Sequence, residues 1–236
     1  MSLTYPPQNH QPPCATVDTV ILTIKNNQLQ VLIIKRKHEP FKHMWSLVGG
    51  IVDVKHDQSL EDTAQRKLLE KTNITAPYLE QYQTIGNAHR DPRGFSTSTI
   101  YFALIHADSL ELHPGKGALE IKWSSIKDNH IQEPLAFDHA EILAGCLERI
   151  RSKVMYTTLP VYLLPKTFTL SELQQTYEII MDKKIERKSF HRRMLGANLL
   201  QKTGENKYSG RRPAAMYELI NRDNAHYFSR NIGQSF

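Results

Sequence analysis

The chain of 236 residues is 40% hydrophobic and 23% charged, the ordinary composition of a folded protein long enough for two modest domains. Its apolar runs fall short of the roughly 20 residues that a membrane span needs. The polar, proline-rich start at 1–13 lacks the apolar segment of a secretory signal. We therefore expect a cytoplasmic protein without a membrane partner, with a flexible N-terminus at 1–14.

Positive charge is concentrated near the C-terminus. Residues 1–165 contain 17 Lys and Arg against 17 Asp and Glu, whereas residues 166–236 contain 13 against 7. The second segment therefore holds all of the net charge of +6. A neutral part followed by a basic part is expected when one domain binds a small ligand and the other binds a polyanion.

Two strands and a helix are predicted first along the chain. Runs of β-branched and aliphatic residues predict strands at 17–24 and 29–35. A helix follows, because Leu60, Ala64 and Leu68 recur at the spacing of one helix face. Its start carries a weak capping box, Ser59 with Asp62. Taken alone, this segment is an ordinary amphipathic helix.

Two short segments around this helix resemble the signature of the Nudix family. The sequence WSLVGG at 45–50 is similar to the family's Trp-x-Leu-Pro-Gly-Gly, with valine in place of proline. The sequence RKLLEKTNI at 66–74 follows the pattern Arg-Glu-apolar-x-Glu-Glu-x-Gly-apolar at Arg66, at Glu70 and at its apolar positions. The resemblance implies a Nudix α/β sandwich over 15–153, in which a mixed sheet is packed with helices.

Lysines occupy two of the three positions at which this signature has carboxylates. Lys67, Glu70 and Lys71 stand at i, i+3 and i+4, so they share one helix face. Carboxylates there would hold Mg²⁺, which prefers oxygen ligands and activates the attacking water of a hydrolase, whereas lysines repel it. We expect no bound metal, no required cofactor and no catalytic residue. The lysines would instead compensate the charge of a bound diphosphate.

The C-terminal third has the pattern of a winged helix-turn-helix, an α+β fold expected over 167–236. Two short helices with apolar stripes are predicted at 170–181 and 188–195, followed by strand, loop and strand. The preceding segment 154–166 contains two prolines, which limit backbone freedom, and we expect it to be a linker.

In such a module the second helix enters the major groove, while the wing contacts the DNA backbone or the minor groove. The candidate DNA-binding residues are Lys188, Ser189, His191, Arg192 and Arg193 on the helix, and Lys202, Lys207, Arg211 and Arg212 on the wing. Each cation has a simpler interpretation as a solvated surface residue. We expect about half of these residues to make no direct contact with DNA.

Two further segments extend the resemblance. GNAHRDPRG at 86–94 is similar to the Arg-Asp-Pro-Arg-Gly loop of ADP-ribose-recognising Nudix proteins, and PLAFDH at 134–139 is similar to their Leu-Ala-Phe-Asp-His segment. With the altered signature and the winged helix, nearly the whole chain resembles the NrtR family of Nudix-related transcriptional regulators. The resemblance implies a homodimeric repressor of NAD metabolism genes. Its effector would be ADP-ribose or a related NAD-derived nucleotide, and its macromolecular partner double-stranded operator DNA.

The candidate ligand-binding residues follow from these segments and from the chemistry of a diphosphate. Guanidinium groups bind phosphate oxygens in pairs, a loop carboxylate accepts hydrogen bonds from ribose hydroxyls, and an aromatic ring stacks on adenine. The predicted ligand-binding residues are Arg36, Trp45, Gly50, Lys67, Glu70, Lys71, Arg90, Asp91, Arg93 and His139. Simpler interpretations stay open: a loop arginine paired with Asp91, Trp45 in the core, and Asp138 as a helix cap.

Two other functions stay open. An active Nudix hydrolase of ADP-ribose or a related nucleoside diphosphate would draw metal capacity from Glu70 and from the carboxylates upstream of it. An RNA-processing Nudix protein would also use basic charge. RNA readers favour aromatic platforms for unstacked bases, however, and the predicted second helix offers only Phe190.

Overall fold

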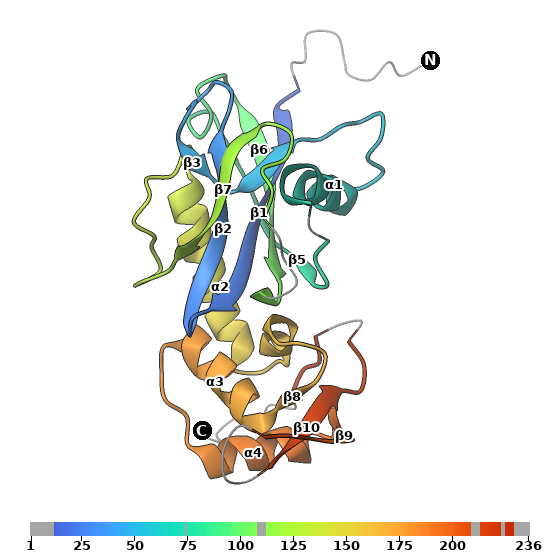
Figure 1. Cartoon of the computed structure of the whole chain (residues 1–236). Helices are drawn as coiled ribbons and strands as arrows, with labels where there is room; N and C mark the ends of the chain where they lie inside the picture. Colours follow the sequence, from blue (N-terminus) through green and yellow to red (C-terminus); the bar gives the residue numbers. More distant parts are fainter. Residues whose placement is uncertain (1–11, 74, 108–111, 209–212, 223–224, 229–236) are drawn as a thin grey trace, which may run out of the picture.

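The computed structural model describes residues 12–73, 75–107, 112–208, 213–222 and 225–228. They form two units stacked along one axis: a sheet flanked by helices and, below it in Figure 1, a smaller helical unit with a short sheet. The helix α2 (His139–Val154) runs from the upper unit to the boundary between the two. Among the described residues, no helix is both long and apolar enough to cross a bilayer.

The N-terminal unit is built on a mixed sheet, as predicted, and this sheet has seven strands among the described residues. The strands are β1 (Cys14–Lys25), β2 (Gln28–Arg36), β3 (Trp45–Ser46), β4 (Val48–Ile51), β5 (Leu79–Asn87), β6 (Ser96–Leu104) and β7 (Ala118–Ser125). The order is β3-β2-β1-β6-β5, with β4 paired to β1 and β7 paired to β2. β1 and β6 are parallel, whereas β1–β2 and β5–β6 are antiparallel. The two predicted strands are the central parts of β1 and β2.

Two helices cover opposite faces of this sheet. α1 (Leu60–Thr72) packs through Leu68 against residues such as Ile21, whereas α2 packs against the alternate residues, such as Val20. This division follows from the period of two in a strand, because neighbouring side chains point to opposite faces.

The start of α1 differs from the sequence prediction in two details. Leu60 is 39% exposed, and the buried face of the helix begins about one turn later, at Thr63 and Ala64. The Ser59 hydroxyl accepts a hydrogen bond from the Asp62 N–H (3.0 Å), as predicted. The Asp62 carboxylate, however, accepts from the Gln58 N–H, so the predicted capping box is not reciprocal.

The C-terminal unit has the element order of a winged helix, as predicted. Its elements are η2 (Leu159–Leu163), β8 (Phe168–Thr169), α3 (Leu170–Met181), α4 (Arg187–Gly196), β9 (Leu200–Lys207) and β10 (Ala214–Leu219). The three strands form a sheet in the order β8-β10-β9. The two predicted helices are confirmed to within a residue at each end, and their apolar stripes meet where Tyr177 and Phe190 pack edge to face (5.1 Å).

The segment predicted as a linker connects the two units, and its middle part is buried. Residues 159–163 form the 3-10 helix η2, and all side chains of this helix are buried. They belong to one hydrophobic core that continues from the sheet through α2 to α3 and α4. The apolar side chains of Leu159, Val161 and Leu163 account for this burial. We call residues 154–166 the joint.

Candidate functional site

The charged side chains on α1 pair with one another and with Asp57. The Arg66 guanidinium donates to both carboxylate oxygens of Asp57 (2.6 and 2.5 Å) and to Glu70 (3.1 Å). The bonds from Arg66 to Asp57 hold the pKa of Asp57 well below its ordinary value. Lys67 donates to the second oxygen of Glu70 (3.1 Å). Its carbon chain lies against Gly50, where an added Cβ would come within 3.0 Å. The structure therefore places Gly50, Lys67 and Glu70 together.

Lys71, the second lysine of this face, holds its proton weakly. Burial lowers its pKa from the ordinary 10.5 to about 8; the charge of Asp18 opposes this change, and the charges of Lys67 and Arg36 add to it. Lys71 of α1 therefore lies close enough to Asp18 of β1 and Arg36 of β2 for their charges to interact. An anion bound beside Lys71 would restore the ordinary affinity of this lysine for its proton.

A buried network of charges lies on the other face of the sheet, where β1 meets the start of α2. Asp18 accepts a hydrogen bond from the Ser98 hydroxyl (2.7 Å) and lies 3.7 Å from Arg90 and 3.6 Å from His139 Nε2. Arg90 donates to both oxygens of Asp138 (2.9 and 3.0 Å), and only 5% of its side chain is exposed. Direct phosphate binding by Arg90 therefore requires this bidentate pair to open.

Asp138 and His139 support the network from the first residues of α2. Asp138 occupies the N-cap position but makes no side-chain capping bond, because its oxygens bind Arg90. The simpler interpretation of Asp138 as a cap is therefore wrong. The Leu47 N–H donates to Nδ1 of the buried His139 (3.0 Å), so Nε2 carries the proton. Burial lowers the pKa of His139 and keeps its ring neutral near pH 7.

The loop after β5 and the end of β2 bring two arginines near each other. Arg93 donates to both oxygens of Asp91 (3.0 and 2.7 Å) while half of its side chain stays exposed, so the paired-loop interpretation holds for Arg93. The Arg36 guanidinium lies 4.7 Å from the ring centre of Phe137 and donates to the Pro40 carbonyl (2.8 Å). Burial and the nearby charge of Arg93 lower the pKa of Arg36. Because the charges of Arg36 and Arg93 repel each other, a bound anion near both would be favoured.

Trp45 packs against the core that the sheet shares with α2. Its ring is contacted by the ammonium groups of Lys122 (4.5 Å) and Lys35 (5.8 Å). Lys67 and Lys71 lie on α1, which covers the opposite face of the sheet. These contacts therefore support a packing role for Trp45. Stacking of Trp45 on adenine stays a prediction.

The helix α4 presents a cationic stripe to solvent. Phe190 and Met194 are buried, so Lys188 and Arg192, one turn apart on the other side, are exposed. Arg187, which the sequence analysis did not select, is exposed at the first position of the helix. We call Arg187, Lys188 and Arg192 the α4 stripe.

The other predicted residues of α4 have less access. Ser189 is half-buried, and its N–H donates to the carboxylate of the N-cap residue Glu186 (2.6 Å). His191 is half-buried, and desolvation lowers its pKa. Its buried Nε2 has no hydrogen-bond partner among the residues that the structure describes. The Arg193 guanidinium lies 5.5 Å from the ring centre of Phe228. These contacts turn Arg193 toward the interior side of the helix.

The predicted wing residues divide into three kinds. Lys202 is exposed on β9. Lys207 pairs with Glu172 (2.6 Å), the residue that completes the capping box of α3, so it ties the wing to that helix. Arg211 and Arg212 lie outside the described residues.

Sequence reasoning missed the residues that organise the site from within. Asp18 sits in the middle of an apolar strand, and a buried carboxylate in such a run is itself a signal, because it needs a partner to offset its desolvation. Phe137 has a left-handed backbone (φ 57°), which is costly for a bulky residue and is typical of functional sites. No feature of the sequence pairs Arg90 with Asp138, which are joined only by the fold.

Comparisons with known proteins match both units. Family models match residues 15–146, as a NUDIX domain, and residues 160–219, as the NrtR DNA-binding winged helix domain. The "ADPR responsive transcriptional repressor NtrR" of Acinetobacter baylyi is 41% identical over 228 residues, covering 97% of this chain and 90% of that protein. The chain belongs to the NrtR family. Every predicted ligand-binding residue lies within the NUDIX match and every predicted DNA-binding residue within the winged-helix match.

Solved NrtR structures agree with this assignment. Shewanella oneidensis NrtR complexed with a 27mer DNA is 39% identical and has a TM-score of 0.84, covering 92% of this chain and 99% of that one. The NUDIX domain of that NrtR complexed with ADP ribose is 39% identical and has a TM-score of 0.57, covering 62% of this chain and 94% of that one.

The lysines of α1 generate a first prediction. Within the described ranges, no three His, Cys, Asp or Glu side chains form a cluster suited to a metal ion. Replacing Lys67→Glu together with Lys71→Glu restores three carboxylates on one helix face, so we expect calorimetry to detect a Mn²⁺ site that the wild-type protein lacks. The matched control replaces two exposed lysines, Lys25→Glu with Lys42→Glu, which changes the net charge equally. Equal Mn²⁺ affinity in both variants would contradict the prediction.

Proposed function

We propose that this NrtR protein is an ADP-ribose-responsive transcriptional repressor. It binds ADP-ribose through its N-terminal unit and, as a homodimer, operator DNA through the α4 stripe and the wing. The observation that carries the proposal is the pairing of two features in one chain. A Nudix helix has cations at two metal-ligand positions, and a winged helix has an exposed cationic stripe.

The ligand side of the proposal rests on an excess of positive charge that a diphosphate would offset. Arg36 and Arg93 lie near each other, and Lys71 is close enough to Arg36 for the two charges to interact. The half-exposed Arg93 has its outer surface available to a ligand. Guanidinium groups bind phosphate oxygens in a bidentate manner, whereas an ammonium group acts as a point charge.

Impaired hydrolysis is supported by the surroundings of Glu70. Its two carboxylate oxygens already accept hydrogen bonds from Arg66 and Lys67. A metal ion would have to displace both cations and approach two lysines, at a cost that rises as water is excluded. We therefore propose that the chain binds ADP-ribose without cleaving it at a catalytic rate.

The test of the proposed function is a calorimetric titration of the full chain with ADP-ribose in the presence of Mg²⁺. The same samples are then assayed for released AMP. We expect saturable binding and no AMP beyond the protein-free control. Release of AMP at a catalytic rate would replace the proposal with the hydrolase, and an absence of binding would remove the effector.

The lowered pKa of Lys71 makes the affinity for ADP-ribose dependent on pH. Lys71 is protonated at pH 7 and loses its charge as the pH rises through about 8, so the affinity for an anionic ligand should fall between pH 7 and pH 9, by up to about tenfold for one linked proton. Lys71→Met should remove this dependence, whereas Lys55→Met, at an exposed lysine, should keep it. An unchanged pH profile in Lys71→Met would show that Lys71 does not face the ligand.

The α4 stripe makes a prediction for DNA binding. Each phosphate contact releases counterions, so Arg192→Ala should weaken binding to duplex DNA and reduce the slope of log K against log salt by about 1. Lys55→Ala, at an exposed lysine of the other unit, is the control. The measurement is fluorescence anisotropy from 50 to 200 mM salt. Equal slopes for Arg192→Ala and Lys55→Ala would contradict the role of the stripe.

A further inference from the structure

Two elements run side by side from the candidate ligand site to the joint. β5 begins next to the joint and ends at Asn87, whose side-chain oxygen accepts from the N–H groups of His89 and Arg90 (2.8 Å each) and so shapes the ligand loop. α2 begins beside that loop, after Asp138, and ends in the joint. Its 16 residues give it a length of about 24 Å. Both elements therefore reach from one proposed site toward the other.

β5 and α2 are fixed to each other at both ends. At the ligand end, Arg90 makes its bidentate pair with Asp138. At the joint end, the Lys153 ammonium donates to both carboxylate oxygens of Glu80 (2.5 Å each). We call these two ion pairs the upper pin and the lower pin.

Between the two pins, α2 and β5 pack closely against each other. Gly145 of α2 faces Tyr82 of β5, and a Cβ added at Gly145 would come within 2.7 Å of the Tyr82 oxygen. The Arg149 guanidinium lies 5.7 Å from the centre of the same ring. A shift of one element against the other at the ligand end is therefore carried along to the joint and is not absorbed in between.

The lower pin is sensitive to such a shift because its lysine is buried, whereas Glu80 is partly exposed. Only 8% of the Lys153 side chain is exposed. The Tyr78 hydroxyl also donates to Glu80, which fixes the carboxylate from the β5 side. Separating a buried ammonium from its carboxylate leaves a charge without compensation, which is far more costly than breaking an exposed pair. The pin therefore favours two distinct states, paired or rearranged.

Contacts continue from the lower pin to the DNA-binding helix. The Lys153 ammonium lies 6.0 Å from the ring centre of Tyr227, which forms a β-bridge with Thr157 of the joint. The next residue, Phe228, donates its N–H to the Tyr156 carbonyl (2.8 Å) and packs against Arg193 of α4. The segment 225–228 thus connects the end of α2 to α4.

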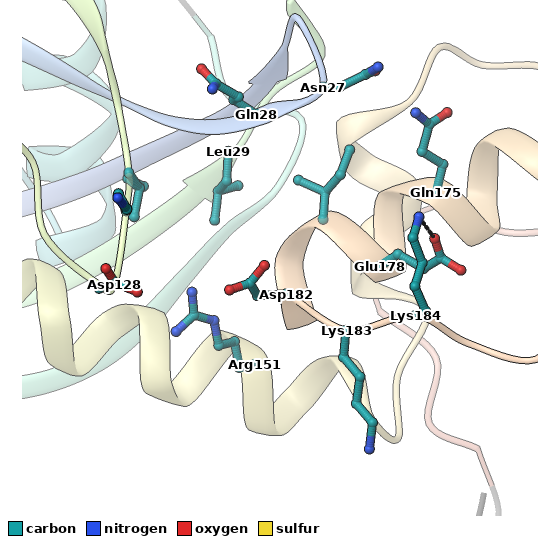
Figure 2. A pocket seen from close by; sticks show the side chains of 13 residues that line it. Asn27, Gln28, Leu29, Asp128, Arg151, Gln175, Glu178, Asp182, Lys183 and Lys184 are labelled. Atoms are coloured by element: carbon teal, nitrogen blue, oxygen red, sulfur yellow. Dashed lines mark hydrogen bonds and ion pairs between the residues drawn. The ribbon is translucent and has the colours of Figure 1, made fainter.

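Near the end of α2, Arg151 binds α3 and lines a cleft. Arg151 donates to the Ile180 carbonyl at the end of α3 (2.9 Å) and to the Asn129 side chain. The cleft has a volume of about 620 Å³ and is lined by residues of both units. Figure 2 shows Arg151 projecting from α2 toward Asp128 and Asp182, which also line it. The cleft leaves room on this side for the C-terminal unit to change its angle when α2 repacks.

We propose that Glu80 and Lys153 are positioning residues that transmit ligand occupancy at the N-terminal unit to the orientation of α4. The inference rests on the proposed function. A bound diphosphate competes with Asp138 for the Arg90 guanidinium, which loosens the upper pin and lets α2 move against β5. The lower pin then rearranges, and the joint and the segment 225–228 carry the change to α4. Neither residue is among those proposed to bind ligand or DNA.

The experiment measures a coupling factor, defined as the ratio of the Kd for DNA with saturating ADP-ribose to the Kd without it. The DNA probe is a duplex selected by the wild-type protein from a random-sequence library in the absence of ADP-ribose. For the wild type we expect a factor of about 5 to 150, the usual range for allosteric coupling. A wild-type factor of 1 would overturn the proposed function, and the inference with it.

The decisive variant is Glu80→Gln with Lys153→Met. The introduced glutamine keeps an acceptor for the Tyr78 hydroxyl and the introduced methionine keeps the packing volume, so the fold should survive the loss of both charges. We expect its coupling factor to fall at least fivefold below that of the wild type, while its Kd for ADP-ribose stays within about threefold. Glu120→Gln, which breaks the exposed Lys35–Glu120 pair (2.7 Å) on the same sheet, should keep the wild-type factor.

Two results would overturn the inference while leaving the proposed function intact. One is a wild-type coupling factor in the folded double variant. The other is an equal loss of coupling in Glu120→Gln, which would mean that any lost ion pair on the sheet has the same effect. Thermal unfolding of each variant establishes that folded proteins are being compared.

Discussion

One helix, α2, carries a single hydrophobic core from the N-terminal unit into the C-terminal unit, and most of the architecture depends on it. The first turns of α2 bury Ile142 and Leu143 against the sheet, and its last turns bury Ile150 and Val154 against the joint and α3. Because a packed core is close to incompressible, neither unit can tilt without repacking this helix. The two units therefore form a mechanically connected pair, and an event at the N-terminus of α2 has a physical route to the C-terminal unit.

Charge compensation shapes the N-terminal unit as strongly as apolar packing does. Glu70 is held by two cations of its own helix, Arg90 is held by Asp138, and Asp18 lies within 4 Å of Arg90 and His139. Each of these groups would be destabilising if buried alone, so each fixes the position of its partner. A ligand with two phosphates would meet cations that are already paired with carboxylates. Its binding is therefore expected to redistribute existing ion pairs as well as to add new ones.

The C-terminal unit separates its structural residues from its exposed ones by helix geometry. The side of α4 that packs on α3 carries Phe190 and Met194, which leaves Lys188 and Arg192 facing outward. Arg193 sits between the two sides, and its contact with Phe228 makes it part of the route from the joint. Cations of one helix therefore have different roles according to the direction in which each side chain points.

The sequence by itself determined the local elements and the chemistry of single motifs. Strands at 17–24 and 29–35 and helices at 170–181 and 188–195 follow from short-range periodicity, which depends only on neighbouring residues. The lysines at 67 and 71 could also be recognised in one dimension, because i, i+3 and i+4 always share a helix face. The tertiary structure alone decided which distant charges meet. Arg90 pairs with a residue 48 positions away and Lys153 with one 73 positions away, and no local pattern encodes such contacts. It also decided that 159–163 is buried in the core, because burial depends on what surrounds an apolar segment and not on the segment alone.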